Sequence, residues 1–147
     1  MSATQAAPLR SDVPDIAGIV EIFVDLAVVA GAKIMRVWAD KPRAKMKPDR
    51  SPVCAADEAA EAIILRGLAE RLPHIPVVSE EAVSRGEIPA VGSLFILVDP
   101  LDGTKEFLAD SNEFTVNLAL IRDGAPIAGV VYAPALGRLW TGGPTAT

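Results

Sequence analysis

The chain has 147 residues, half of them hydrophobic, and carries a formal net charge of −5 at neutral pH. This length and composition fit one globular domain with a sizeable core. The acidic balance excludes a protein that coats a nucleic-acid polymer, because binding a polyanion requires an excess of lysine and arginine. A small anionic ligand is still compatible with the charge if metal ions mediate the contact.

The first predicted element is a long helix after a polar N-terminus. Residues 1–11 lack the apolar core of a signal peptide, and we expect them to be flexible. The helix is predicted to start with Ser11 or Asp12 as its N-cap, to hold Pro14 in its first turn and to end near Val37. Two acids interrupt its apolar stretch, so it is expected to belong to a soluble protein, with contact to a membrane surface as a second interpretation.

A basic loop with two prolines, 41–50, separates this helix from a second one expected over about 55–72. Apolar residues recur every fourth position along the second helix: Ala60, Ile64, Leu68 and Leu72. This spacing predicts one face buried in the core.

The rest of the chain is predicted to be mainly β-strand. Strands are expected at 75–79, 94–98, 114–121, 126–132 and near 139–141. The Asp123-Gly124 pair between the third and fourth of these runs indicates a hairpin. The order of elements predicts an α+β domain over 12–141, with two helices packed on a mostly antiparallel sheet and a tail at 142–147.

Residues 99–104, Asp-Pro-Leu-Asp-Gly-Thr, directly follow a buried-looking strand and have the character of a metal site. Hard cations such as Mg²⁺ prefer oxygen ligands, and a turn containing proline and glycine can aim Asp99, Asp102 and the Leu101 carbonyl at one point. By itself the motif is also compatible with a solvated loop. Asp57 at a helix start and Glu80 at a strand end are candidates for the same cleft.

Several segments resemble the inositol monophosphatase superfamily in order and spacing. They are 51–57 (Ser-Pro-Val-Cys-Ala-Ala-Asp), 78–81 (Val-Ser-Glu-Glu), 99–107 (Asp-Pro-Leu-Asp-Gly-Thr-Lys-Glu-Phe), 113–121 and 129–134. The resemblance implies a layered sugar-phosphatase fold and a phosphatase that depends on Mg²⁺, with two or three ions per complete site, and is typically inhibited by lithium.

With Lys105 directly after Asp-Gly-Thr, the sequence resembles the CysQ-type 3'(2'),5'-bisphosphate nucleotidases within that superfamily. This branch implies hydrolysis of the 3'-phosphate of adenosine 3',5'-bisphosphate to AMP and phosphate, in sulfur metabolism. Two alternatives are left open: an inositol or other sugar monophosphatase, and an inactive remnant that acts as an interaction module.

The resemblance also implies a role for each site residue. Glu80, Asp99 and the Leu101 carbonyl would hold one Mg²⁺, and Asp99 with Asp102 a second. Asp57 and Thr104 would orient and deprotonate the attacking water. The residues expected to contact the phosphorylated substrate are Glu80, Asp99, Leu101, Asp102, Gly103, Thr104 and Lys105.

Two departures from the family pattern affect these expectations. Cys54, the only cysteine, stands where the family commonly has threonine, and we interpret it as a small packed residue in a reducing cytoplasm. The family's second half, with a Trp-Asp motif that completes the second metal site, has no counterpart in the sequence. We therefore expect a truncated form without the C-terminal domain, which could form homo-oligomers through an exposed sheet edge or lie peripherally on the inner membrane.

Overall fold

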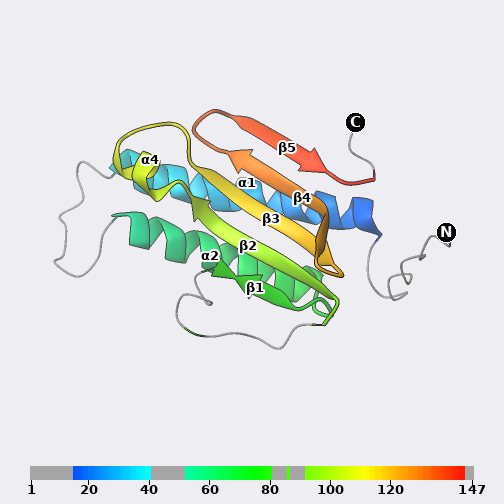
Figure 1. Cartoon of the computed structure of the whole chain (residues 1–147). Helices are drawn as coiled ribbons and strands as arrows, with labels where there is room; N and C mark the ends of the chain where they lie inside the picture. Colours follow the sequence, from blue (N-terminus) through cyan, green and yellow to red (C-terminus); the bar gives the residue numbers. More distant parts are fainter. Residues whose placement is uncertain (1–14, 41–51, 81–85, 87–91, 145–147) are drawn as a thin grey trace.

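The computed structural model describes residues 15–40, 52–80, 86 and 92–144. Helices α1 (Ile16–Asp40) and α2 (Pro52–Arg71) cover one face of a five-stranded sheet (Figure 1). The strands are β1 (Val77–Ser79), β2 (Leu94–Asp102), β3 (Thr115–Arg122), β4 (Ala125–Ala133) and β5 (Arg138–Gly142). A short helix, α4 (Thr104–Leu108), connects β2 to β3. The predicted α+β architecture is confirmed.

The strands lie in the order β1-β2-β3-β4-β5. β1 and β2 run parallel and the other three neighbouring pairs run antiparallel, so the sheet is mostly antiparallel, as predicted. The β3–β4 turn places Asp123 at φ 51° and Gly124 at φ 78°. Positive φ at both central residues matches the twist of a hairpin, which explains the Asp-Gly pair in the sequence.

Helix α1 begins and ends later than the sequence suggested. Its first residue is Ile16, and the Gly18 backbone N–H donates to Asp15 Oδ1 at 2.8 Å. Asp15 is thus the N-cap expected at Ser11 or Asp12, because its side chain accepts from an amide that has no partner within the helix. The helix ends at Asp40. The expectations for residues 1–14 and for the loop at 41–50 lie outside the described residues.

The two helices pack through their apolar sides. The predicted stripe on α2 is confirmed, since the residues at this spacing are all buried: Ala60, Ile64, Leu68 and Leu72. Gly67 lies against Leu26 of α1 so closely that an added Cβ would collide with that side chain. A glycine in mid-helix costs roughly 1 kcal/mol in propensity, and here it permits close approach of α1 and α2.

Helix α1 directs most of its apolar side chains into the core. Ile19, Phe23 and Ile34 are fully buried, whereas Val28 and Val29 are exposed. Within the described residues, neither helix combines the length and apolarity needed to cross a bilayer.

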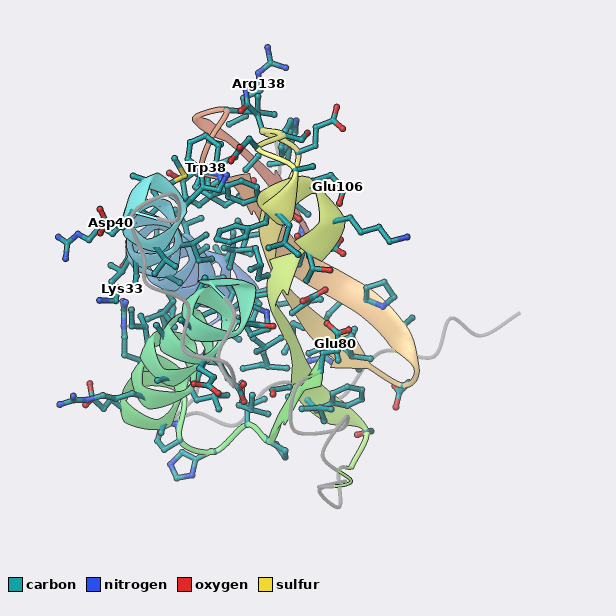
Figure 2. All side chains as sticks on the ribbon, turned by 90° about the vertical axis from the view of Figure 1, so that its left-hand side faces the viewer. Lys33, Trp38, Asp40, Glu80, Glu106 and Arg138 are labelled. Atoms are coloured by element: carbon teal, nitrogen blue, oxygen red, sulfur yellow. The ribbon has the colours of Figure 1, made fainter. Side chains whose placement is uncertain are left out.

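An aromatic cluster fixes α4 against the rest of the fold. The Phe107 and Phe114 rings meet edge to face with centroids 5.3 Å apart, and Trp38 lies 5.9 Å from Phe114. Trp38 comes from the last turns of α1, which face α4 at the same end of the molecule (Figure 2). Edge-to-face pairs of this kind add to the stability gained from burial, so α4, which follows residues 99–104, is held against α1 and the residue before β3.

Candidate active site

A β-bulge brings the two aspartates of the motif to the same face of the sheet. Asp99 and Asp102 are three positions apart, so in a regular strand their side chains would point to opposite faces. Asp99 pairs with Asn117, but Asp102 pairs with Thr115, so β2 contains one extra residue between them. Both carboxylates therefore emerge on the face of Asn117 and Thr115, away from α1 and α2. We call this the helix-free face.

Glu80 reaches the same face from the neighbouring strand. β1 and β2 are parallel, with Ser79 paired to Val98, so Glu80, which directly follows β1, comes beside Asp99 of β2. Parallel strands present their carboxyl ends at one edge of the sheet, and Glu80 and Asp99 are joined there by a side-chain hydrogen bond. Figure 2 views the molecule from this end and labels Glu80.

The three acids influence one another electrostatically. Partial burial, the hydrogen bond and charge of Glu80, and the charge of Asp102 raise the pKa of Asp99 from 3.8 to about 7, against a lowering effect of the Leu101 backbone N–H. The two neighbouring negative charges thus add to burial in disfavouring the ionised form of Asp99. A cation at this point would relieve that repulsion, which is the electrostatic condition for a metal site.

On the opposite side of β1, Ser79 points toward the helices. Its hydroxyl donates to Glu61 Oε1 of α2 at 2.9 Å, and both residues are almost fully buried, at 3% and 6% exposure. A buried carboxylate is tolerated only with such a partner. The bond ties the end of β1 to α2, directly before Glu80.

Asp57 and Thr104 lie on elements that pack together, α2 and α4. Asp57 is buried in the second turn of α2, and Thr104 is the exposed first residue of α4. In the described part of the chain no direct hydrogen bond joins the two side chains. Their joint action on a water molecule therefore stays a prediction.

Gly103 makes the sharp turn from β2 into α4. Its φ of 91° lies in the left-handed region, and a Cβ there would approach the Glu113 carbonyl oxygen at 3.1 Å and Phe114 Cα at 3.2 Å. Only glycine avoids both the backbone strain and the contact. Lys105, in the first turn of α4, is exposed, and its contact with a substrate stays a prediction.

The helix-free face also holds a residue that the sequence analysis did not single out. Asn117 Nδ2 donates to Asp102 Oδ2 in a long hydrogen bond of 3.5 Å. Asn117 and Asp99 line one end of a hollow of about 670 Å³, whose floor is mainly apolar and includes Ala119, Val131 and Trp140. The signal was an amide within the apolar alternation of β3.

The donor chemistry of this cluster fits magnesium. Its side chains offer carboxylate oxygens, the hard ligands that Mg²⁺ prefers, and Asp99 Oδ1 is buried without a hydrogen-bond partner among the described residues. In that part of the chain no three acidic, histidine or cysteine side chains are drawn together as closely as a finished metal site requires. Glu80 and Asp99 touch, whereas Asp102 acts through its charge. The role of the Leu101 carbonyl as a ligand stays a prediction. The Leu101 side chain is buried and anchors the bulge.

Comparisons with known proteins show which family the chain resembles. The model of the inositol monophosphatase family matches residues 15–144. The 3'(2'),5'-bisphosphate nucleotidase CysQ of Salmonella typhimurium is 50% identical over 118 residues, which cover 79% of this chain and 48% of that protein. The CysQ protein of Escherichia coli K12 is 48% identical over the same length and shares. The chain thus spans about half the length of these curated relatives.

Solved structures show the same similarity. The crystal structure of CysQ from Bacteroides thetaiotaomicron, a member of the inositol monophosphatase family, superposes with a TM-score of 0.70 at 35% identity, covering 87% of this chain and 47% of that one. An inositol monophosphatase from Zymomonas mobilis gives a TM-score of 0.73 at 26% identity, covering 90% of this chain and 49% of that one.

Proposed function

The chain belongs to the inositol monophosphatase family, and on that premise we propose that it is the metal-binding half of a Mg²⁺-dependent 3'(2'),5'-bisphosphate nucleotidase. The proposed reaction is hydrolysis of the 3'-phosphate of adenosine 3',5'-bisphosphate to AMP and phosphate. The similarity to CysQ proteins over 79% of this chain supports the choice of branch.

One observation carries the proposal: Asp99 and Asp102 emerge on the same face through the bulge in β2, with Glu80 beside them. Three acids placed together on a protein of net negative charge would repel a phosphate ester. Bound cations reverse that sign and make the same acids an anion-binding site. Partial burial, followed by the hydrogen bond and charge of Glu80 and the charge of Asp102, raises the pKa of Asp99, and a bound cation would oppose these effects.

In the proposed mechanism the acids hold Mg²⁺, and the residues around them orient the reactants. Glu80, Asp99, Asp102 and the Leu101 carbonyl are the proposed ligands. Bound magnesium supplies positive charge that polarises the phosphoryl group and makes a water molecule easier to deprotonate. The Thr104 hydroxyl orients the attacking water, and the Asp57 carboxylate accepts its proton through that hydroxyl.

The proposed substrate contacts lie at the start of α4. Gly103 makes the turn that presents the start of α4 to the substrate, and the Lys105 ammonium offers a charge-assisted hydrogen bond to a phosphate oxygen. Lys105 is therefore the residue proposed to favour a bisphosphate over a monophosphate. Its effect should appear mainly in KM, since a remote charge contributes uniform binding.

The test is phosphate release by the purified chain with Mg²⁺, with and without Li⁺, on adenosine 3',5'-bisphosphate and on inositol 1-phosphate. We expect faster release from the nucleotide and none after removal of Mg²⁺. A preference for inositol 1-phosphate would replace the nucleotidase by a monophosphatase. No release at high protein concentration, together with measurable Mg²⁺ binding, would indicate a binding module.

Asp99→Asn is the matched loss-of-function variant for this assay, and Asp123→Asn is its control. Both remove one negative charge, but Asp123 lies exposed in the β3–β4 turn. We expect Asp99→Asn to abolish Mg²⁺-dependent release and Asp123→Asn to leave it unchanged. Equal loss in both variants would show a nonspecific effect of net charge.

We also propose that the chain self-associates through a sheet edge and works in the cytoplasm. β1 and β5 are the outer strands, and edge strands offer unpaired backbone groups to another chain. Light scattering tests this, and a monomer at all concentrations contradicts it. For peripheral membrane contact we propose the exposed Val28 and Val29 of α1, and sedimentation with anionic vesicles tests that part.

A further inference from the structure

Asn117 is placed between the two aspartates of the motif. Its backbone is the cross-strand partner of Asp99, so the two side chains share the helix-free face. Its side-chain Nδ2 donates to Asp102 Oδ2, across the bulge. One residue of β3 is therefore paired with Asp99 through its backbone and hydrogen-bonded to the Asp102 carboxylate through its side chain.

An amide at this position has a cost that packing does not explain. Its neighbours along β3 are Val116 and Leu118, and asparagine is disfavoured in strands. Asn117 Oδ1 is buried and accepts no hydrogen bond from the described residues, and the same holds for Asp99 Oδ1. A buried acceptor without a donor costs about 1–3 kcal/mol. Two such oxygens on directly paired residues indicate that a donor or a cation from outside the described chain meets them there.

We propose that Asn117 is a positioning residue for the metal site. Its Nδ2 holds one oxygen of the exposed Asp102 carboxylate and leaves the other directed to the cation. Its Oδ1, on the residue paired with Asp99, accepts from water in the cation's hydration shell. This inference rests on the proposed function, because it takes Asp99 and Asp102 as magnesium ligands.

The physical reason is the freedom of Asp102. Its side chain is exposed and follows the bulge, so the strand does not hold the carboxylate in one orientation. Hydrogen bonds from outer partners orient metal-ligating carboxylates, and losing such a partner typically lowers metal affinity about 10-fold or more. Asn117 is the described residue that makes this contact with Asp102.

The test is calorimetric titration of Mg²⁺ into the full chain and into Asn117→Leu, which keeps the size of the side chain and removes the amide. We expect the dissociation constant for Mg²⁺ to rise about 10-fold. The melting temperature without Mg²⁺ should stay the same or rise, because a buried unsatisfied oxygen is removed. A purely structural amide would instead lower the melting temperature and leave the affinity of the folded protein unchanged.

Two further variants make the result specific. Asn117→Thr retains a hydroxyl donor and should recover part of the affinity; it also gives the comparison if Asn117→Leu does not fold. Asn112→Leu, at an exposed asparagine outside the strands, is the matched control and should bind Mg²⁺ like the unsubstituted chain. In the Asp102→Asn background, Asn117→Leu should have no further effect on affinity, since it acts through Asp102.

The outcomes separate this inference from the proposed function. If the unsubstituted chain binds Mg²⁺ and both Asn117 variants bind it with an affinity within twofold of that value, the positioning role alone is overturned. A chain that shows no heat of Mg²⁺ binding at any concentration overturns the proposed metal site, and the positioning role with it. A 10-fold loss that persists in the Asp102→Asn background would assign the effect to Asp99 instead and also overturn the inference.

Discussion

The two faces of the sheet are built from the same strands but meet different surroundings. On β2, Ile96 points to the helices and is fully buried, whereas its neighbour Leu97 points to the helix-free face and is 42% exposed. Trp140 of β5 lies on the helix-free face as well and is 51% exposed. Apolar residues thus occur on both faces, and only those on the helix-covered face form the core.

The acids follow the opposite distribution. Glu80, Asp99 and Asp102 lie on the helix-free face, whereas the helix-covered face of β1 carries the neutral Ser79 bonded to Glu61. Ionised groups lose less hydration on the open face, and a cation can reach them there. The difference teaches that one face of this sheet carries the core and the other carries the three acids proposed to bind metal.

The comparison can be tested most strongly with Ile96→Ala and Leu97→Ala, a matched pair of adjacent residues. Ile96→Ala should lower the free energy of unfolding by about 2–5 kcal/mol, because it leaves a cavity in the core. Leu97→Ala should cost less than about 1 kcal/mol. Urea denaturation measures both. Similar losses in the two variants would mean that the helix-free face is also packed.

The buried bond between Ser79 and Glu61 tests the polar part of the helix-covered face. Ser79→Ala removes the hydroxyl that donates to Glu61, so we expect a loss of about 1–3 kcal/mol in the free energy of unfolding. Ser93→Ala, at an exposed serine just before β2, is the control and should change little. Because Glu80 follows Ser79, Mg²⁺ affinity should fall in Ser79→Ala. An unchanged affinity would show that β1 holds Glu80 without this bond.

The helix-free face predicts a pH dependence in the absence of metal. The pKa of Asp99 is raised from 3.8 to about 7, so the folded chain holds a proton that the unfolded chain releases. This contribution to stability is complete below pH 3.8 and is lost as the pH rises to 7.

The variant Asp99→Asn should remove that pH dependence. In EDTA at pH 8 it should be more stable than the unsubstituted chain by about 1–2 kcal/mol, after allowance for solvent screening. Added Mg²⁺ should then stabilise the unsubstituted chain and not the variant. Thermal melts at pH 5 and pH 8 measure both effects. A variant that is less stable at pH 8 would contradict the repulsion between the three acids.

The smallest expected effect is a difference in fluorescence between the two tryptophans, which report on the two faces. Trp38 packs against Phe114, so in Trp140→Phe its fluorescence should be protected from acrylamide. In Trp38→Phe the remaining Trp140, exposed on the helix-free face, should be quenched strongly and emit at longer wavelength. Equal quenching of the two would show that another chain covers the helix-free face in solution.

Much of the fold was predictable because its signals are local. The four-residue spacing on α2 and the Asp-Gly pair at 123–124 depend on neighbouring residues only, and the structure confirms both. The start of α1 was placed too early, because several capping residues precede the helix and the sequence does not rank them. In the structure it is Asp15 that accepts the Gly18 amide.

The sequence by itself determined which residues are present for the chemistry: Glu80 at a strand end, and Asp99 and Asp102 around a proline. Only the tertiary structure decided where they point. Two aspartates three positions apart face opposite ways unless a bulge intervenes, and the bulge is visible only through the partner strand. The same pairing places Asn117 opposite Asp99. Side-chain direction in a sheet follows from register, and register is a property of two strands together.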